Sequence, residues 1–195
     1  MDWNASYENQ ETPWDKGRAT PVLTEVIERH PGIFKGHVLV PGCGLGHDAR
    51  QIAKEGASVV GADIAPLALE KARSADPDHL VEFRLLDVLA PPDALLQTFE
   101  VIWEHTCLCA LDPSLRTAYA RSIKTMLKPG GAVAGVFFIN PEMDPGETGP
   151  PFGISVGELT ALWQAVGLEM VDSWVPVTGF EGRIGRERAM ILHLV

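Results

Sequence analysis

Three glycines at alternate positions follow a short apolar run in the stretch VLVPGCGLGHDA, residues 38–49. Gly42 permits a tight turn, and Gly44 and Gly46 remove the Cβ atoms that would keep a ligand away from the backbone. The helix expected next begins with free N–H groups, which suit an anionic or polar ligand. Asp63 stands about 20 residues further on, where a carboxylate accepts hydrogen bonds from both ribose hydroxyls of an adenosine. These residues predict a nucleotide cofactor.

The spacing of the glycines separates two kinds of nucleotide cofactor. The NAD fingerprint is G-x-G-x-x-G, and its third glycine packs the helix against the strand. Here the pattern is G-x-G-x-G, and His47 occupies the position of that third glycine. The pattern therefore disfavours a dinucleotide, and an NAD-type oxidoreductase is kept only as an alternative.

Apolar periodicity and turn signals predict the elements that position these residues. Thr20 is a good N-cap and Pro21 suits the first helical position, so a helix begins there and ends at Pro31-Gly32. Ser155 and Glu158 form a capping box, which starts another helix that runs to Gly167. Three further helices are expected at 47–55, 66–75 and 112–127, the last one stopped by LKPGG at 127–131. Strands are expected at 37–40, 58–64, 81–87, 99–105, 131–139, 169–177 and 187–194.

Strands that alternate with helices, followed by two strands in direct succession, define the fold class. We expect an α/β fold, a Rossmann-like and mostly parallel seven-stranded sheet with helices on both faces and a C-terminal antiparallel hairpin. A single domain covers residues 1–195. Residues 1–19 and 140–153 are expected to be irregular. The 1–19 segment is polar and too weakly patterned to fold alone, so we expect a lid that a bound cofactor orders.

Composition excludes several classes of function. The formal net charge of the chain is −10, and no cluster of Lys and Arg offsets it, so we expect no binding to nucleic acid or to an anionic membrane. Three cysteines predict neither a disulfide framework nor a metal site. The N-terminus has no signal-peptide pattern, and no apolar run approaches about 18 residues. We therefore expect a cytoplasmic monomer that acts on a small molecule.

The glycine loop resembles motif I of the class I S-adenosylmethionine-dependent methyltransferases. The match continues in the LLDV stretch at 85–88, in the LKPGG turn and in the terminal hairpin. The resemblance implies S-adenosylmethionine as the cofactor, with the loop against its methionyl part, Asp63 on the ribose and Asp87 on the adenine amino group. It assigns these cofactor-binding positions: Pro41, Gly42, Gly44, Asp63, Ile64, Asp87 and Val88.

A narrower resemblance rests on four stretches: WDKGRATPVL (14–23), VPGCGLGHDA (40–49), FEVIWEHTCLCALDPSLRTAYA (99–120) and GPPFGIS (149–155). They are similar to the thiopurine S-methyltransferase family, which includes plant and bacterial halide and thiol methyltransferases. The family pattern implies that Trp14 lies over the cofactor and that Glu104 and His105 lie beside it. The position of His105 is Arg in part of the family. Arg18 is expected to steer anions inward or to pair with the cofactor carboxylate, and Arg116 to lie on a solvated helix face.

The same resemblance predicts the chemistry. Methyl transfer from a sulfonium to a soft anion is an in-line displacement that annihilates charge, so the protein must align both reactants and exclude water. A thiolate or halide arrives already ionised, which agrees with the lack of an evident nucleophile–base pair such as Ser–His or Cys–His. The acceptor is therefore expected to be a thiol, such as a thiopurine or a small thiol, or a halide.

Acceptor contacts are expected outside the core of the sheet, from apolar, aromatic and cationic side chains: Phe138, Asn140, Pro151, Phe152, Phe180, Arg183 and Arg186. Two other functions stay open besides the oxidoreductase. Glu104 and His105 provide acid and base groups for an oxygen- or nitrogen-directed methyltransferase. A non-catalytic cofactor-binding subunit is the third possibility, and the aromatic acceptor-side segments disfavour it.

Overall fold

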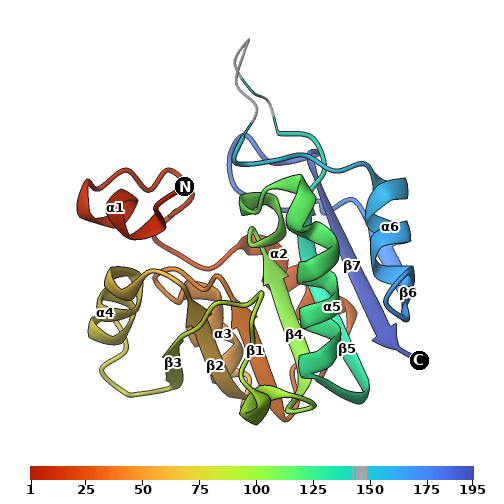
Figure 1. The fold of residues 1–195 in the computed structure, drawn as a ribbon, viewed down its shortest axis with the longest axis horizontal. Coiled ribbons are helices and arrows are strands. Elements are labelled where there is room, and N and C mark those ends of the chain that lie inside the picture. Colours follow the sequence, from red (N-terminus) through yellow and green to blue (C-terminus); the bar gives the residue numbers. More distant parts are fainter. Residues whose placement is uncertain (142, 144–148) are drawn as a thin grey trace.

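The computed structural model of the protein describes residues 1–141, 143 and 149–195. The described residues form one seven-stranded sheet in the order β3-β2-β1-β4-β5-β7-β6 (Figure 1). The first five strands run parallel, and β7 is antiparallel to both β5 and β6. The predicted fold class is confirmed. The strands are β1 (His37–Pro41), β2 (Ser58–Asp63), β3 (Val81–Leu85), β4 (Phe99–His105), β5 (Leu127–Phe138), β6 (Leu168–Trp174) and β7 (Glu187–Leu194).

Helices cover both faces of the sheet because alternate strand residues point to opposite sides. Val38 and Val40 of β1 belong to one core cluster, and Leu39 belongs to the other. The cluster of Val38 includes side chains from the helices α2 (Pro21–Arg29), α3 (His47–Lys54) and α4 (Pro66–Ser74). The cluster of Leu39 includes side chains from α5 (Arg116–Met126) and α6 (Val156–Gln164).

The strand order reverses between β1 and β4, which are neighbours in the sheet although β2 and β3 separate them in the chain. In open α/β sheets, ligands bind at such a switch point, beyond the carboxyl ends of the strands. The glycine loop follows β1, and His105 ends β4. The topology therefore brings together two stretches that are about 60 residues apart in the sequence.

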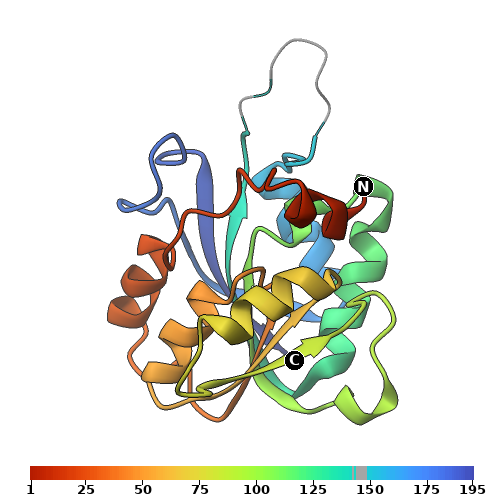
Figure 2. The ribbon, with the colours of Figure 1, turned by 90° about the vertical axis from the view of Figure 1, so that its left-hand side faces the viewer.

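The N-terminal segment contains a helix that the sequence did not indicate. Helix α1 (Trp3–Glu8) is capped by Asp2, whose side chain accepts a hydrogen bond from the Ala5 N–H. Figures 1 and 2 show α1 lying over α4. Tyr7 is only 5% exposed and packs with Ala65 and Ala68 there. The prediction that residues 1–19 are irregular was wrong here. Helix α1 is too short to show periodicity, and its apolar partner comes much later in the chain.

Several predicted boundaries also differ. Helix α6 ends at Gln164 instead of Gly167, and β6 ends at Trp174 instead of residue 177. Strand β3 ends at Leu85, so Asp87 lies beyond it. Strand β5 begins at Leu127, inside the expected LKPGG turn, because Leu127 already pairs with Phe99 before the register shifts. Helix α5 begins at Arg116 because the side chain of Asp112 caps a separate 3-10 turn, Pro113–Leu115. Two other 3-10 turns cover Asp93–Leu95 and Leu108–Ala110.

Part of the expected irregular loop 140–153 lies outside the described residues. Among the described residues, no helix is both long enough and apolar enough to cross a membrane.

Candidate functional site

An open cavity of about 70 Å³ lies at the switch point of the sheet. Three segments line it: the glycine loop after β1, the N-terminal segment and the end of β4. Trp14 and Arg18, both predicted from the N-terminal segment, are part of its wall, and so are Gly42 and Gly44. His105, at the end of β4, lines it as well, so the fold gathers five predicted cofactor residues around one space.

The three glycines have different roles, although φ is positive at each, at 58°, 52° and 73° for Gly42, Gly44 and Gly46. A Cβ on Gly42 would lie 3.1 Å from Sγ of Cys107, and one on Gly44 would lie 3.0 Å from Oη of Tyr7. A Cβ on Gly46 would lie 2.6 Å from a ring carbon of Phe83 in β3. Gly46 therefore serves the packing of loop against sheet. The expectation that it opens the backbone to a ligand was wrong.

Asp63 ties the glycine loop to the end of β2. Its Oδ2 accepts a hydrogen bond from the Gly44 N–H at 2.9 Å, and its Oδ1 accepts one from the Ala65 N–H at 2.9 Å. The carboxyl group is 8% exposed, and this burial raises its pKa above the usual value for aspartate. Any change at Asp63 therefore disturbs the loop as well as whatever the carboxylate binds.

The predicted adenine side lies along the same edge of the sheet. Ile64, the residue after β2, is 53% exposed, and Leu85, which pairs with Asp63 across β2 and β3, is 62% exposed. Asp87 is exposed and accepts a hydrogen bond from the Leu89 N–H at 2.9 Å, whereas Val88 is buried in the core. An exposed apolar surface and an exposed carboxylate thus follow the ends of β2 and β3, outside the cavity described above.

His105 at the end of β4 is held by an aspartate that the sequence did not single out. Nδ1 of His105 lies 2.8 Å from Oδ2 of Asp48, in the first turn of α3. Asp48 also accepts hydrogen bonds from Nε1 of Trp103 and from the Thr20 N–H, both at 2.8 Å. Burial alone would raise the pKa of the Asp48 carboxyl, but His105 and these donors lower it below the usual value. Asp48 is therefore a carboxylate, and His105 is its partner.

The position of Asp48, directly after the glycine loop, is the one signal that could have indicated it. A second such pair joins the N-terminal segment to the loop, since Nε2 of His47 lies 3.1 Å from Oδ1 of Asp15. Nε1 of Trp14 donates a hydrogen bond to Oη of Tyr7 at 3.2 Å. The N-terminal segment is thus attached to the cavity by polar contacts between residues remote in sequence.

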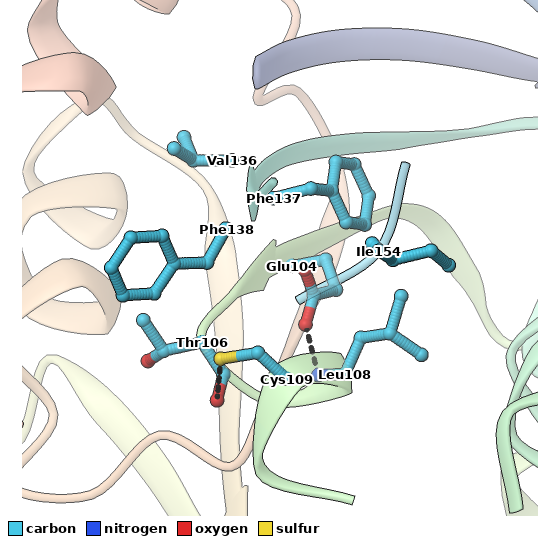
Figure 3. Close-up of a pocket in the computed structure, with 8 residues that line it drawn as sticks. All are labelled: Glu104, Thr106, Leu108, Cys109, Val136, Phe137, Phe138 and Ile154. Atoms are coloured by element: carbon cyan, nitrogen blue, oxygen red, sulfur yellow. Dashed lines mark hydrogen bonds between the residues drawn. The ribbon is translucent and has the colours of Figure 1, made fainter. Parts of the chain in front are cut away.

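Glu104 points to the opposite side of β4 and lines a smaller pocket of about 10 Å³, which is room for about one water molecule (Figure 3). Its Oε1 accepts hydrogen bonds from the backbone N–H groups of Cys107 and Leu108, at 3.0 and 2.7 Å. Burial raises the pKa of Glu104 to about 7. The other walls of this pocket are mostly apolar and include Phe138 and Ile154. The pocket is therefore narrow and mostly apolar, with one titratable carboxyl in its wall.

Thr106 lines both the cavity and the pocket, so the two spaces meet at this residue. Its φ of 65° is rare for a β-branched residue, and such conformations concentrate at functional sites. Cys109, also in the pocket wall, has a pKa raised to about 12 by burial, so its thiol stays protonated. Among the described residues, no group of three or more His, Cys, Asp or Glu side chains can hold a metal ion.

Two of the predicted acceptor residues, Phe138 and Phe180, belong to these walls. The ring of Phe180 stacks on His105 with centroids 6.4 Å apart. The Arg183 guanidinium lies 5.1 Å from the ring centroid of Phe138 and 5.8 Å from that of Phe180. Arg18 lies 5.8 Å from the same Phe180 ring. Cations and aromatic rings therefore alternate around the junction.

The other predicted acceptor residues are placed differently. In the described part of the chain, neither wall includes Asn140, Pro151, Phe152 or Arg186.

Arg116 was expected to face solvent, but its Nη2 donates hydrogen bonds to the carbonyls of Phe152 and Gly153, at 3.3 and 2.8 Å. That expectation was wrong because the segment that folds over α5 comes from beyond β5. Arg116 holds this segment next to the pocket.

Comparison with known proteins agrees with this geometry. The profile of the thiopurine S-methyltransferase family matches residues 1–181. The chain is 33% identical to probable thiol methyltransferase 2 of Arabidopsis thaliana over 174 residues, covering 87% of this chain and 74% of the relative. It is 32% identical to thiocyanate methyltransferase 1 of Brassica oleracea over 191 residues, covering 95% and 81%. A thiopurine S-methyltransferase of Legionella pneumophila is 26% identical, covering 83% and 79%.

Solved structures share the fold at lower identity. One, reported for the conversion of a disulfide bond into a thioacetal group during echinomycin biosynthesis, has a TM-score of 0.81 at 20% identity, covering 98% of this chain and 90% of the other. Burkholderia thailandensis 1,6-didemethyltoxoflavin-N1-methyltransferase, with bound S-adenosylhomocysteine, has a TM-score of 0.77 at 21% identity, covering 100% and 86%. The chain belongs to the thiopurine S-methyltransferase family and is an S-adenosylmethionine-dependent methyltransferase.

Proposed function

We propose that the protein transfers the methyl group of S-adenosylmethionine to a small soft nucleophile, with the sulfur of a thiol preferred and a halide as the further acceptor class. The observation that carries this proposal is the set of relatives named for thiol, thiocyanate and thiopurine acceptors, which match most of the chain. An oxygen- or nitrogen-directed activity is the alternative.

The described residues fit this cofactor. Gly42 and Gly44 line the cavity, and the missing Cβ of Gly44 leaves space beside Oη of Tyr7 in its wall. We assign the ribose to Asp63 and the adenine to the surface beside Ile64 and Asp87. Trp14 and Arg18 close the cavity from the N-terminal side. The polar contacts of residues 1–19 support their assignment as a lid. When bound, S-adenosylmethionine supplies an electrophilic methyl group.

We place the reacting group of the acceptor at the mouth of the smaller pocket. The pocket meets the cavity at Thr106, so an acceptor placed there has its nucleophile facing the cofactor side. Apolar walls remove water from a soft anion, which raises its reactivity, and the nearby Arg183 favours negative charge. Below pH 7 the Glu104 carboxyl is neutral and does not repel an anion there, because burial raises its pKa to about 7.

Labelled S-adenosylmethionine offered with an alkyl thiol, a thiopurine, thiocyanate, iodide, a phenol and an amine tests the acceptor class. We expect label in the methylated sulfur compounds. Label in the phenol or amine alone would overturn the proposal in favour of the alternative. Calorimetry with S-adenosylhomocysteine and with NAD measures the preference of the site for its cofactor, and we expect binding of S-adenosylhomocysteine alone.

A matched pair of variants tests the cofactor site. Gly44→Ala and Gly56→Ala both place alanine at positive φ, 52° and 92°, but only Gly44 lines the cavity. We expect Gly44→Ala to weaken the binding of S-adenosylhomocysteine and Gly56→Ala to leave it unchanged. Equal effects would mean that backbone strain alone is responsible.

We further propose that the protein is a cytoplasmic monomer, and light scattering of the purified protein measures its oligomeric state.

A further inference from the structure

We propose that His105, oriented by Asp48, accepts the proton of a neutral thiol acceptor during methyl transfer. This inference rests on the proposed function, because it needs a thiol as substrate. It adds a base to a reaction for which the sequence indicated no nucleophile–base pair.

The first support is the arrangement of the imidazole ring. Asp48 is a carboxylate and can only accept hydrogen bonds, so Nδ1 of His105 carries the proton that the two share at 2.8 Å. In the neutral ring, Nε2 is then a bare acceptor. Within the described part of the chain, this buried Nε2 has no hydrogen-bond partner. A buried polar atom without a partner is costly, and such atoms are commonly kept for a ligand.

The second support is the place of the ring. His105 lines the cavity that contains the glycine loop, and the next residue, Thr106, lines both the cavity and the acceptor pocket. A nucleophile must lie where these two spaces meet in order to approach the methyl group. His105 is therefore beside the reacting atom, with Phe180 stacked on its ring.

The charges around the ring determine its basicity. Burial alone would lower the pKa of His105, but Asp48 on α3 and Glu187 on β7 raise it, and Arg183 lowers it. The net result is a pKa above the usual value for histidine. Glu104, the preceding residue of β4, is the remaining titratable neighbour, and its pKa responds to the charge of His105. The neutral ring is therefore a stronger base than an ordinary imidazole, and it takes a thiol proton once the pH exceeds its raised pKa.

The proposed step balances. The S–H proton moves to Nε2, and the electron pair of the acceptor sulfur forms the new S–CH₃ bond. The bond between the methyl group and the cofactor sulfur breaks, and its electron pair stays on that sulfur. The products are a thioether, S-adenosylhomocysteine and a His105 imidazolium, which returns its proton to solvent.

Glu104 is the competing candidate, since its carboxyl lines the acceptor pocket and its pKa is about 7. Its Oε1 is engaged by the N–H groups of Cys107 and Leu108. The two candidates give the same rise of rate with pH, so the pH profile alone does not separate them. Removing the charge of Asp48 does, because Asp48 contacts His105 and not Glu104.

The experiment measures kcat/KM against pH for two alkyl thiols of different pKa. We expect one inflection that both thiols share and that matches the pKa of His105 measured by NMR. Asp48→Asn should lower the pH of the inflection and the NMR-measured pKa of His105 by about one unit or more, because the anion that stabilises the imidazolium is gone. Glu104→Gln should keep the inflection. His105→Gln should reduce kcat/KM for thiols by about 100-fold or more and should remove the inflection from the pH profile.

His30→Gln is the matched control. Nε2 of His30 lies 2.9 Å from Oδ2 of Asp172 on the outer surface, so this change removes a similar pair away from the cavity. The profile of this variant should equal that of the wild type.

An inflection that follows the pKa of each thiol would overturn the proposal. An inflection at the same pH in Asp48→Asn as in the wild type would also overturn it. Should His105→Gln fail to fold, Asp48→Asn and the NMR titration still decide. Failure of the proposed function itself is distinct, because the wild type would then methylate no thiol at any pH.

Discussion

Replacing Glu104 by Gln tests whether its buried carboxyl opposes folding at high pH. The side chain is 1% exposed, and burial raises its pKa from an ordinary 4.5 to about 7. The folded state therefore binds the proton more tightly than the unfolded state. The stability that comes from the neutral carboxyl is complete below pH 4.5 and is lost as the pH rises through about 7.

The magnitude follows from the pKa values. Each pKa unit corresponds to about 1.4 kcal/mol, so the rise from 4.5 to about 7 costs the folded state about 3 kcal/mol at high pH. Roughly 2 kcal/mol of this falls between pH 5 and pH 8, because the unfolded carboxyl is already largely ionised at pH 5. Gln is uncharged at every pH and keeps an oxygen for the N–H groups of Cys107 and Leu108.

Urea unfolding of the wild type and of Glu104→Gln at pH 5 and pH 8 measures the effect. We expect the free energy of unfolding of the variant, relative to the wild type, to rise by about 2 kcal/mol over this interval. Glu100→Gln on the same strand is the control. The hydrogen bond from Lys128 lowers the pKa of Glu100, so it stays ionised and its difference from the wild type should not change. A pH-independent difference for Glu104→Gln would refute the reasoning.

Three further outcomes are expected. Asp63→Ala should weaken the binding of S-adenosylhomocysteine by about 1–3 kcal/mol in calorimetry, since it removes both the proposed ribose contact and the anchor of the glycine loop; unchanged affinity would contradict the assignment. Hydrogen exchange in residues 1–19 should slow when S-adenosylhomocysteine binds, and equal protection with and without it would argue against a lid. Arg116→Ala should lower the free energy of unfolding by about 1 kcal/mol, because it removes the hydrogen bond to the Gly153 carbonyl. Arg121→Ala, at an exposed position of the same helix, should leave the free energy of unfolding unchanged. Equal unfolding free energies for the two variants would show that the hydrogen bond contributes nothing.

The order and type of most elements followed from local patterns. A continuous apolar run such as Val38–Val40 indicates a strand that is buried on both faces. Proline or capping residues indicate where α2, α4 and α6 begin. The short helix α1 was not predicted, because its six residues are too few to show a helical periodicity. Its stability comes from packing on α4, which no local window contains.

The sequence by itself determined the kind of cofactor loop, since the glycines and Asp63 act through backbone conformation and a fixed distance along one β-α-β unit. Only the tertiary structure decided the surroundings of that loop. It paired His105 with Asp48, stacked Phe180 on His105 and brought Arg116 to Gly153. The physical reason is that hydrophobic periodicity reports which face of an element is buried, while a contact between remote residues depends on strand order and loop path. Those are settled by the packing of the whole domain.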